Sequence, residues 1–256
     1  MSFADVAIAV AIGLGSGILA GVFGVGGGIV MTPGLQVFLG VPAIVALATP
    51  LPAIFPTALA GALAYRRRGE VDTRAAVLLI VPGLFGAAIG AWLTDLVDTT
   101  LLLLLTAVLL GSQAIAIVRG GRRTARGTPG EAAAPILASI GAAAGFVSGL
   151  LGIGGGIVIV PLLAGWLGMP LKRALGTSLL AISVLVIPGA IVHAALGHID
   201  LGICLALAAG AVPGARIGAA LALGARERTL RLVVGSGLLA VAIAYAIDQL
   251  ATLRAH

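Results

Sequence analysis

Two short stretches of this sequence combine residue types that could bind an anion within an apolar chain. The first reads GVFGVGGGIVMTP over residues 21–33, and the second reads GLLGIGGGIVIVP over residues 149–161. Glycine costs roughly 1 kcal/mol in a helix interior and proline roughly 3 kcal/mol, so both stretches should interrupt a helix. A glycine turn that starts a new helix exposes backbone N–H groups at the positive end of the helix dipole. Each stretch therefore predicts an anion site that needs no charged side chain.

The candidate substrate-binding residues come first from these turns and their prolines. Three adjacent glycines permit a tight turn, and the apolar residues after them form a helix too short to span a membrane comfortably. Close helix packing is the alternative role of these glycines. Nucleotide binding is disfavoured because neither stretch has GxGxxG spacing or a following GK[ST]. The residues are Gly24, Gly26, Gly27, Gly28, Pro33, Gly152, Gly154, Gly155, Gly156 and Pro161.

Four further polar residues lie at expected membrane depth, where such groups are functional candidates. Thr49, Thr177 and Ser178 could donate hydrogen bonds to an oxyanion or bond back to their own helix. Arg216 could pair with the anion or extend to the membrane surface.

The composition requires a lipid environment for these turns. Hydrophobic residues make up 60% of the 256 residues and charged residues only 9%, whereas soluble domains average about 25% charged. Apolar runs long enough to cross a bilayer recur along the chain, which predicts an all-α polytopic membrane protein. The net charge of +6 is scattered over short loops, so it does not indicate nucleic-acid binding.

The sequence is an internal duplication with an offset of 128 residues. Between residues 17–40 and 145–168, 12 of 24 positions are identical, and Thr49 and Asp72 recur as Thr177 and Asp200. Transporters are often built from such repeats. We expect a first membrane repeat at 1–118, a cytoplasmic linker at 119–132 and a second membrane repeat at 133–256.

Each repeat is expected to hold four transmembrane helices and a glycine-rich broken hairpin. A retained first segment is favoured over a cleaved signal peptide because the start lacks basic residues. The predicted segments are 4–23, 28–40, 44–65, 75–94 and 100–118, followed by 133–151, 156–168, 174–194, 201–222 and 230–248. Prolines at 50, 52 and 56 interrupt only the first repeat, so the two halves should not be equivalent.

The loop charges predict opposite orientations for the two repeats. Arginines lie in the 66–74 loop and the 119–131 loop, whereas the 95–99 loop carries Asp95 and Asp98 and no basic residue. The positive-inside rule places the first two loops in the cytoplasm. The corresponding loops of the second repeat have the reverse charge pattern, which predicts an inverted-topology repeat with both termini outside the cytoplasm.

The remaining titratable residues favour an anionic substrate. All nine carboxylates fall in loops or at segment ends, whereas cation-coupled transporters usually keep one at membrane depth. His193, His198 and Asp200 are expected to form a solvated interface rather than a metal site, and the single Cys204 excludes a cysteine metal cluster. No metal or other cofactor is expected, and no nucleophile–base pair suggests an enzyme.

The doubled GxGGGxxxxP motif, the two similar halves and the length resemble the TauE/SafE sulfite exporter family. The resemblance covers nearly the whole chain and implies a bacterial inner-membrane transporter exporting small anions such as sulfite or organosulfonates, for example sulfoacetate. Alternating access around a midplane site between the two turns is the mechanism expected of such a protein. An anion channel and a non-transport membrane assembly protein are the alternatives. The partners implied are the small anion and the lipid bilayer, and a homodimer is left open.

Overall fold

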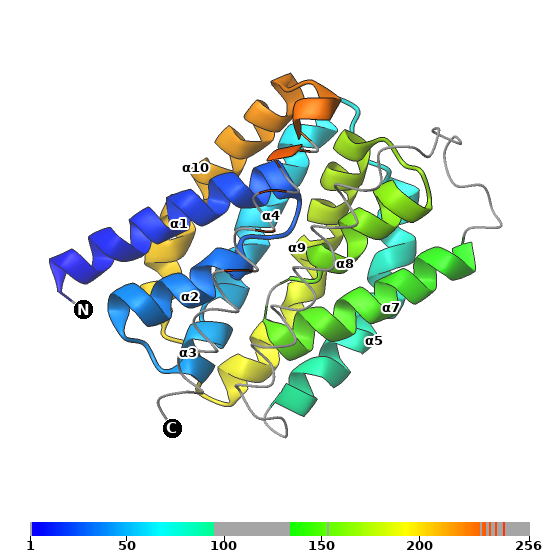
Figure 1. Cartoon of the computed structure of the whole chain (residues 1–256). Coiled ribbons are helices and arrows are strands. Elements are labelled where there is room, and N and C mark those ends of the chain that lie inside the picture. The colour runs from blue at the N-terminus through cyan, green and yellow to red at the C-terminus, as the bar shows by residue number, and fades with distance from the viewer. Residues whose placement is uncertain are drawn as a thin grey trace.

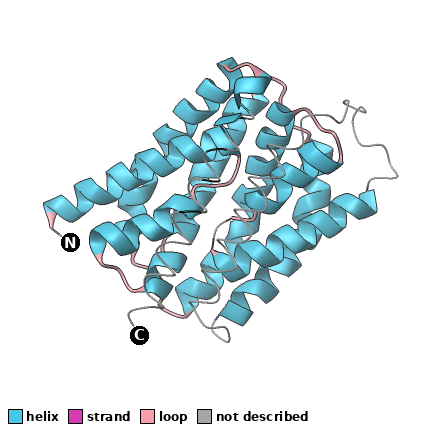
Figure 2. Cartoon of the chain, viewed as in Figure 1, coloured by secondary structure: helices cyan, strands magenta, loops and turns pink. Residues whose placement is uncertain are grey.

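A computed structural model describes residues 2–94, 134–152 and 154–230 of the chain, together with isolated positions at 232–233, 236, 239 and 243. Every element in this part of the chain is helical, as Figure 2 shows. The predicted segments 100–118 and 230–248 and the predicted linker 119–132 lie wholly or almost wholly outside the described residues.

Six of the helical segments are long and apolar enough to cross a membrane. Two shorter apolar helices, α2 and the α8–η3 segment, follow the glycine turns, as expected from the sequence. In chain order the elements are α1 (Phe3–Phe23), α2 (Gly28–Leu39), α3 (Ala43–Ala48), α4 (Pro50–Arg66), α5 (Thr73–Leu93), α7 (Ala134–Leu151), α8 (Gly156–Pro161), the π-helix η3 (Leu162–Trp166), α9 (Leu171–Ala195) and α10 (Leu201–Gly224).

Local sequence explains where these helices begin and end. Ser2 and Asp5 form a capping box at the start of α1, with Ser2 N donating to Asp5 Oδ2 at 2.7 Å. Asp72 and Asp200 cap α5 and α10 in the same way, each carboxylate accepting from the amide three residues later at 3.0 Å. The two halves therefore start corresponding helices with the same device.

The predicted asymmetry between the halves is present. A proline follows Thr49, and the chain is divided there into α3 and α4, whereas α9 runs unbroken over 25 residues. Proline removes a backbone donor, which accounts for the division. The second short helix differs from the first as well, because Pro161 ends α8 and a π-helix follows it.

The helices α4 and α9 form the centre of the molecule. Figure 1 shows them between the α1–α10 pair and the α5–α7 pair. In both central segments, 61% of the most apolar window is buried, against 39–44% for α1, α5 and α7. The central helices are thus the elements most able to position buried functional groups.

The outer helix pairs pack through glycine, and their contacts repeat with the 128-residue offset. A Cβ added at Gly13, Gly17 or Gly21 of α1 would collide with the backbone of α10, and the glycines of α7 meet the backbone of α5 in the same way. Such close approach is typical of membrane helix interfaces. The matching contacts are Gly13–Leu207 with Gly141–Leu79, Gly17–Ala211 with Gly145–Gly83, and Gly21–Ala215 with Gly149–Ala87.

Candidate anion site at the glycine turns

Corresponding glycines of the two turns have similar backbone conformations. Positive φ values occur at Gly24, Gly26 and Gly27 (69°, 86° and 86°) and at Gly152, Gly154 and Gly155 (67°, 83° and 70°). Left-handed backbone is costly for residues with a Cβ and nearly free for glycine. Three of the four motif glycines in each turn are therefore explained by conformation alone.

The two turns lie directly against each other. A Cβ on Gly156 would be 2.6 Å from both Gly24 O and Val25 Cα, and one on Gly154 would be 3.6 Å from Val25 O. Gly156 has no positive φ, so its lack of a side chain is required by this close approach rather than by conformation.

Two equivalent isoleucines, 128 positions apart, cover the turns. The Cγ2 of Ile182 lies 2.9 Å from a Cβ built on Gly26 and 3.0 Å from one built on Gly154, and Ile54 Cγ2 lies 3.3 Å and 3.7 Å from the same two points. Both isoleucines are fully buried, one on α4 and the other on α9. The central helices thus place apolar side chains against the point where the two turns meet.

Several backbone amides of the turns have no hydrogen-bond partner among the described residues. Within the described part of the chain, the N–H groups of residues 25–28 and 154–156 donate no hydrogen bond, although these residues are buried. Buried backbone donors are normally paired, since leaving one unpaired costs about 1–3 kcal/mol. Unpaired donors at a helix N-terminus can bind a negatively charged or strongly accepting group.

Side chains from the two central helices donate hydrogen bonds to backbone carbonyl groups beside the first turn. Ser178, on α9, donates to Gly24 O at 2.8 Å, and Tyr65, on α4, donates to Gly21 O at 2.9 Å. Both side chains are fully buried. These two bonds occupy carbonyl acceptors at the end of α1, immediately before the first turn.

Thr49 and Thr177 each make a hydrogen bond that the sequence did not predict. Thr177 Oγ1 accepts from the backbone N–H of Asp72 at 2.9 Å, and Thr49 Oγ1 accepts from that of Asp200 at 3.1 Å. The two bonds are equivalent and connect the halves at opposite ends of the central helices. At the Asp72 end, the aspartate also forms an ion pair with Arg173 at 3.1 Å.

Arg216 is not brought to the turns. Its side chain is exposed on α10, whereas the packed side of that helix, at Ala215, Gly218 and Ala219, contacts Gly21. Of the two prolines, Pro161 is buried at the end of α8 and Pro33 is partly buried within α2. Each lies five residues after the last glycine of its turn, Pro33 inside the short helix α2 and Pro161 at the last residue of α8.

The expected solvated interface near the end of α9 is wrong for His193. This residue is 0% exposed and occupies the position equivalent to Tyr65, while its Nδ1 lies 3.2 Å from His198 Nδ1. No group of three or more metal-ligating side chains occurs among the residues described.

Sequence reasoning missed Ser148, which lies beside the second turn. Its Cβ is 3.3 Å from a Cβ built on Gly155, and its hydroxyl is buried without a hydrogen-bond partner. The equivalent residue in the first half is Ala20, so only one turn has this extra hydroxyl. A comparison of the two halves at this position would have identified it.

Comparison with known proteins agrees with this architecture. The sequence profile of the family described as Sulfite exporter TauE/SafE matches residues 9–245. The chain is 30% identical to the probable membrane transporter protein YunE of Bacillus subtilis, over 89% of this chain and 92% of that protein. It is 31% identical to a probable membrane transporter protein of Xylella fastidiosa, over 89% of each chain, and 26% identical to MJ0441 of Methanocaldococcus jannaschii, over 86% and 87%. No solved structure matches.

Proposed function

Since this chain belongs to the TauE/SafE sulfite exporter family of membrane transporters, we propose that it exports a small oxyanion such as sulfite or an organosulfonate. The single observation that carries the proposal is the cluster of buried, unpaired amides where the two glycine turns meet. An oxyanion accepts several hydrogen bonds at once, so converging N–H donors suit it better than they suit a cation or a neutral apolar molecule.

The second part of the proposal is that the halves are inverted in the membrane. The support comes from α4 and α9, which correspond to each other after a shift of 128 residues. Gly61 of α4 faces Leu179 of α9, and Gly189 of α9 faces Leu51 of α4, so these equivalent helices run antiparallel. A two-fold axis relating antiparallel helices is perpendicular to them, which for spanning helices means within the membrane plane.

Alternating access follows from this symmetry as a mechanism. Ile54 and Ile182, both fully buried, pack over the turns. The Thr177–Asp72 and Thr49–Asp200 bonds hold the two ends of the central helices. Release of one end at a time would expose the turns first to one side of the membrane and then to the other.

The orientation can be tested with two single cysteines at equivalent positions. Arg68→Cys and Leu196→Cys, each combined with Cys204→Ala, change exposed residues at the ends of α4 and α9. We propose that the chain lies in a bacterial inner membrane with the Arg68 end in the cytoplasm. A membrane-impermeant maleimide should then label the Leu196 variant in intact cells and the Arg68 variant only after lysis. Labelling of both from one side would contradict the inversion.

Transport is tested in proteoliposomes loaded with radiolabelled sulfite, sulfoacetate, sulfate or acetate. A transporter gives saturable efflux that is accelerated by the same anion on the opposite side. Efflux that does not saturate and shows no such acceleration would indicate an anion channel instead. If the protein is folded and shows no flux of any of these anions, the proposal that it transports this substrate class is refuted.

A further inference from the structure

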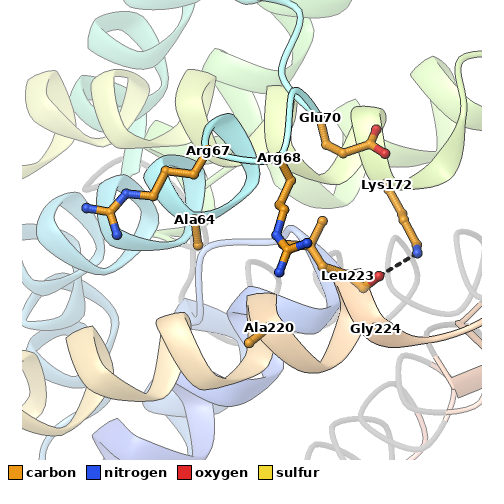
Figure 3. A pocket seen from close by; sticks show the side chains of 8 residues that line it. All are labelled: Ala64, Arg67, Arg68, Glu70, Lys172, Ala220, Leu223 and Gly224. Carbon is orange, nitrogen blue, oxygen red and sulfur yellow. Dashed lines mark hydrogen bonds between the residues drawn. The ribbon is translucent and has the colours of Figure 1, made fainter.

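A polar cavity lies at the Arg68 end of the bundle. Its volume is about 500 Å³, and it lies between the end of α4, the start of α9 and the last turn of α10, as Figure 3 shows. Pockets of this size hold small ligands. The lining residues are Ala64, Arg67, Arg68, Glu70, Lys172, Ala220, Leu223 and Gly224.

The charged side chains that line this cavity differ in whether they make a hydrogen bond. Lys172 Nζ donates to Leu223 O at 2.6 Å, so it neutralises the carbonyl end of α10. Within the described ranges, the guanidinium groups of Arg67 and Arg68 make neither hydrogen bonds nor ion pairs. Figure 3 shows Arg68 reaching from α4 toward α10. Glu70 is the one acidic residue in the lining, so the lining side chains carry a net positive charge. Arg68 extends across the cavity without a hydrogen-bond or ion-pair partner among the described residues.

Because the sequence is duplicated, the basic residues of this cavity can be compared with their equivalents at the other end of the bundle. Positions equivalent to Arg67, Arg68 and Lys172 are occupied by Ala195, Leu196 and Ile44 at the other end of the bundle. The two ends otherwise share the threonine–aspartate contact and the capped helix start. The basic lining is therefore a property of one membrane face rather than a requirement of the fold.

We propose that this cavity binds the phosphodiester of an anionic phospholipid headgroup. The cavity lies at the ends of the spanning segments α4 and α10, where headgroups lie. Ala64 and Leu223 contribute apolar side chains to its lining. One turn below, Ile217 and Leu221 are 48% and 59% exposed on α10, which provides an apolar surface for an acyl chain beneath the bound phosphate. Arginine presents several donors to phosphate, and Arg68 is the principal ligand.

The test compares two neighbouring arginines by native mass spectrometry of the full chain. Arg68 lines the cavity, whereas Arg66, also exposed and in the same basic run, does not. Arg68→Ala should weaken phosphatidylglycerol binding about tenfold, equivalent to about 1.4 kcal/mol. Arg66→Ala should leave it nearly unchanged, and phosphatidylethanolamine should bind weakly to all three proteins. Thermal unfolding in detergent checks that both variants are folded.

Two results would overturn the proposal. Equal losses for Arg66→Ala and Arg68→Ala would mean that lipid is attracted to the whole basic surface rather than bound in the cavity. Stabilisation of the lipid-free protein by inorganic phosphate or sulfate, dependent on Arg68 and as strong as that by phosphatidylglycerol, would assign the cavity to a free oxyanion.

Discussion

Replacing Gly156 with alanine isolates the contact between the two glycine turns. This residue has ordinary helical φ, so alanine adds no backbone strain there. The new Cβ would lie 2.6 Å from Gly24 O and Val25 Cα and 2.5 Å from Ile182 Cδ1. Raising 2.6 Å to the 3.4 Å of ordinary contact requires a displacement of about 0.8 Å between the turns. Overpacking a close-packed core by one methyl group typically costs about 1–3 kcal/mol.

Gly165→Ala is the matched control for this substitution. It lies in the same segment, has no positive φ, and its added Cβ meets nothing within 4 Å. Alanine in an open helical position is favoured over glycine by up to about 1 kcal/mol. Thermal unfolding of the purified proteins should therefore show a lower midpoint for Gly156→Ala and an unchanged or higher one for Gly165→Ala.

A second substitution, at Ile182, distinguishes a clash with that side chain from a clash with the backbone of the first turn. Adding Ile182→Val removes Cδ1 but leaves the backbone carbonyl of Gly24 in place, so it should not restore the stability of Gly156→Ala. Equal midpoints for the Gly156 and Gly165 variants, or full rescue by Ile182→Val, would refute the direct contact of one turn with the backbone of the other.

Three further substitutions test the surroundings of the turns by the same unfolding measurement. Thr177→Val leaves the Asp72 amide without its acceptor and should destabilise the protein by about 1–3 kcal/mol, whereas an unchanged midpoint would mean that water replaces the hydroxyl. Tyr65→Phe removes the bond to Gly21 O and should cost about 1 kcal/mol, with Tyr65→Ala costing more through the lost ring volume. Ser148→Ala removes a buried hydroxyl without a partner, so it should stabilise the free protein while weakening sulfite binding; a loss of stability would show that the hydroxyl is already paired.

The segment boundaries were predictable because hydrophobic length and proline or glycine interruptions are local properties of a sequence. The break after Thr49 and the short helices after both turns were expected from residue type alone, and both are present. The six long apolar helices agree with the predicted segments within a few residues.

Residue roles that depend on packing between the halves were not predictable in this way. The threonine bonds to Asp72 and Asp200 join residues more than 100 positions apart, and residue type gives no information on such contacts. For His193, a polar side chain near a helix end suggested solvation, but close packing of the bundle buries it completely. The duplication itself holds the missing information, since Tyr65 is the buried residue at the equivalent position.

The roles of individual motif glycines also required the structure. The sequence left open whether the glycines pack or present amides, and the structure shows which of them are required for close packing. Gly156 is needed for close approach, whereas Gly27 has a φ of 86° and ordinary distances of 3.4–3.5 Å around an added Cβ. Gly27 is therefore the position at which conformation can be changed with the least steric disturbance.

Sulfite binding to the Gly27→Ala variant, measured by isothermal titration calorimetry, tests the anion site most directly. Gly69→Ala is its control, because Gly69 also has a positive φ, 73°, but lies in open space in a loop. Left-handed backbone costs alanine about 1–2 kcal/mol at either position, so the two variants should have similar stability. We predict that Gly69→Ala binds sulfite as the unmodified protein does and that Gly27→Ala, whose turn must relax and redirect its amides, does not. Equal binding by both variants would contradict the assignment of the glycine turns as the anion site.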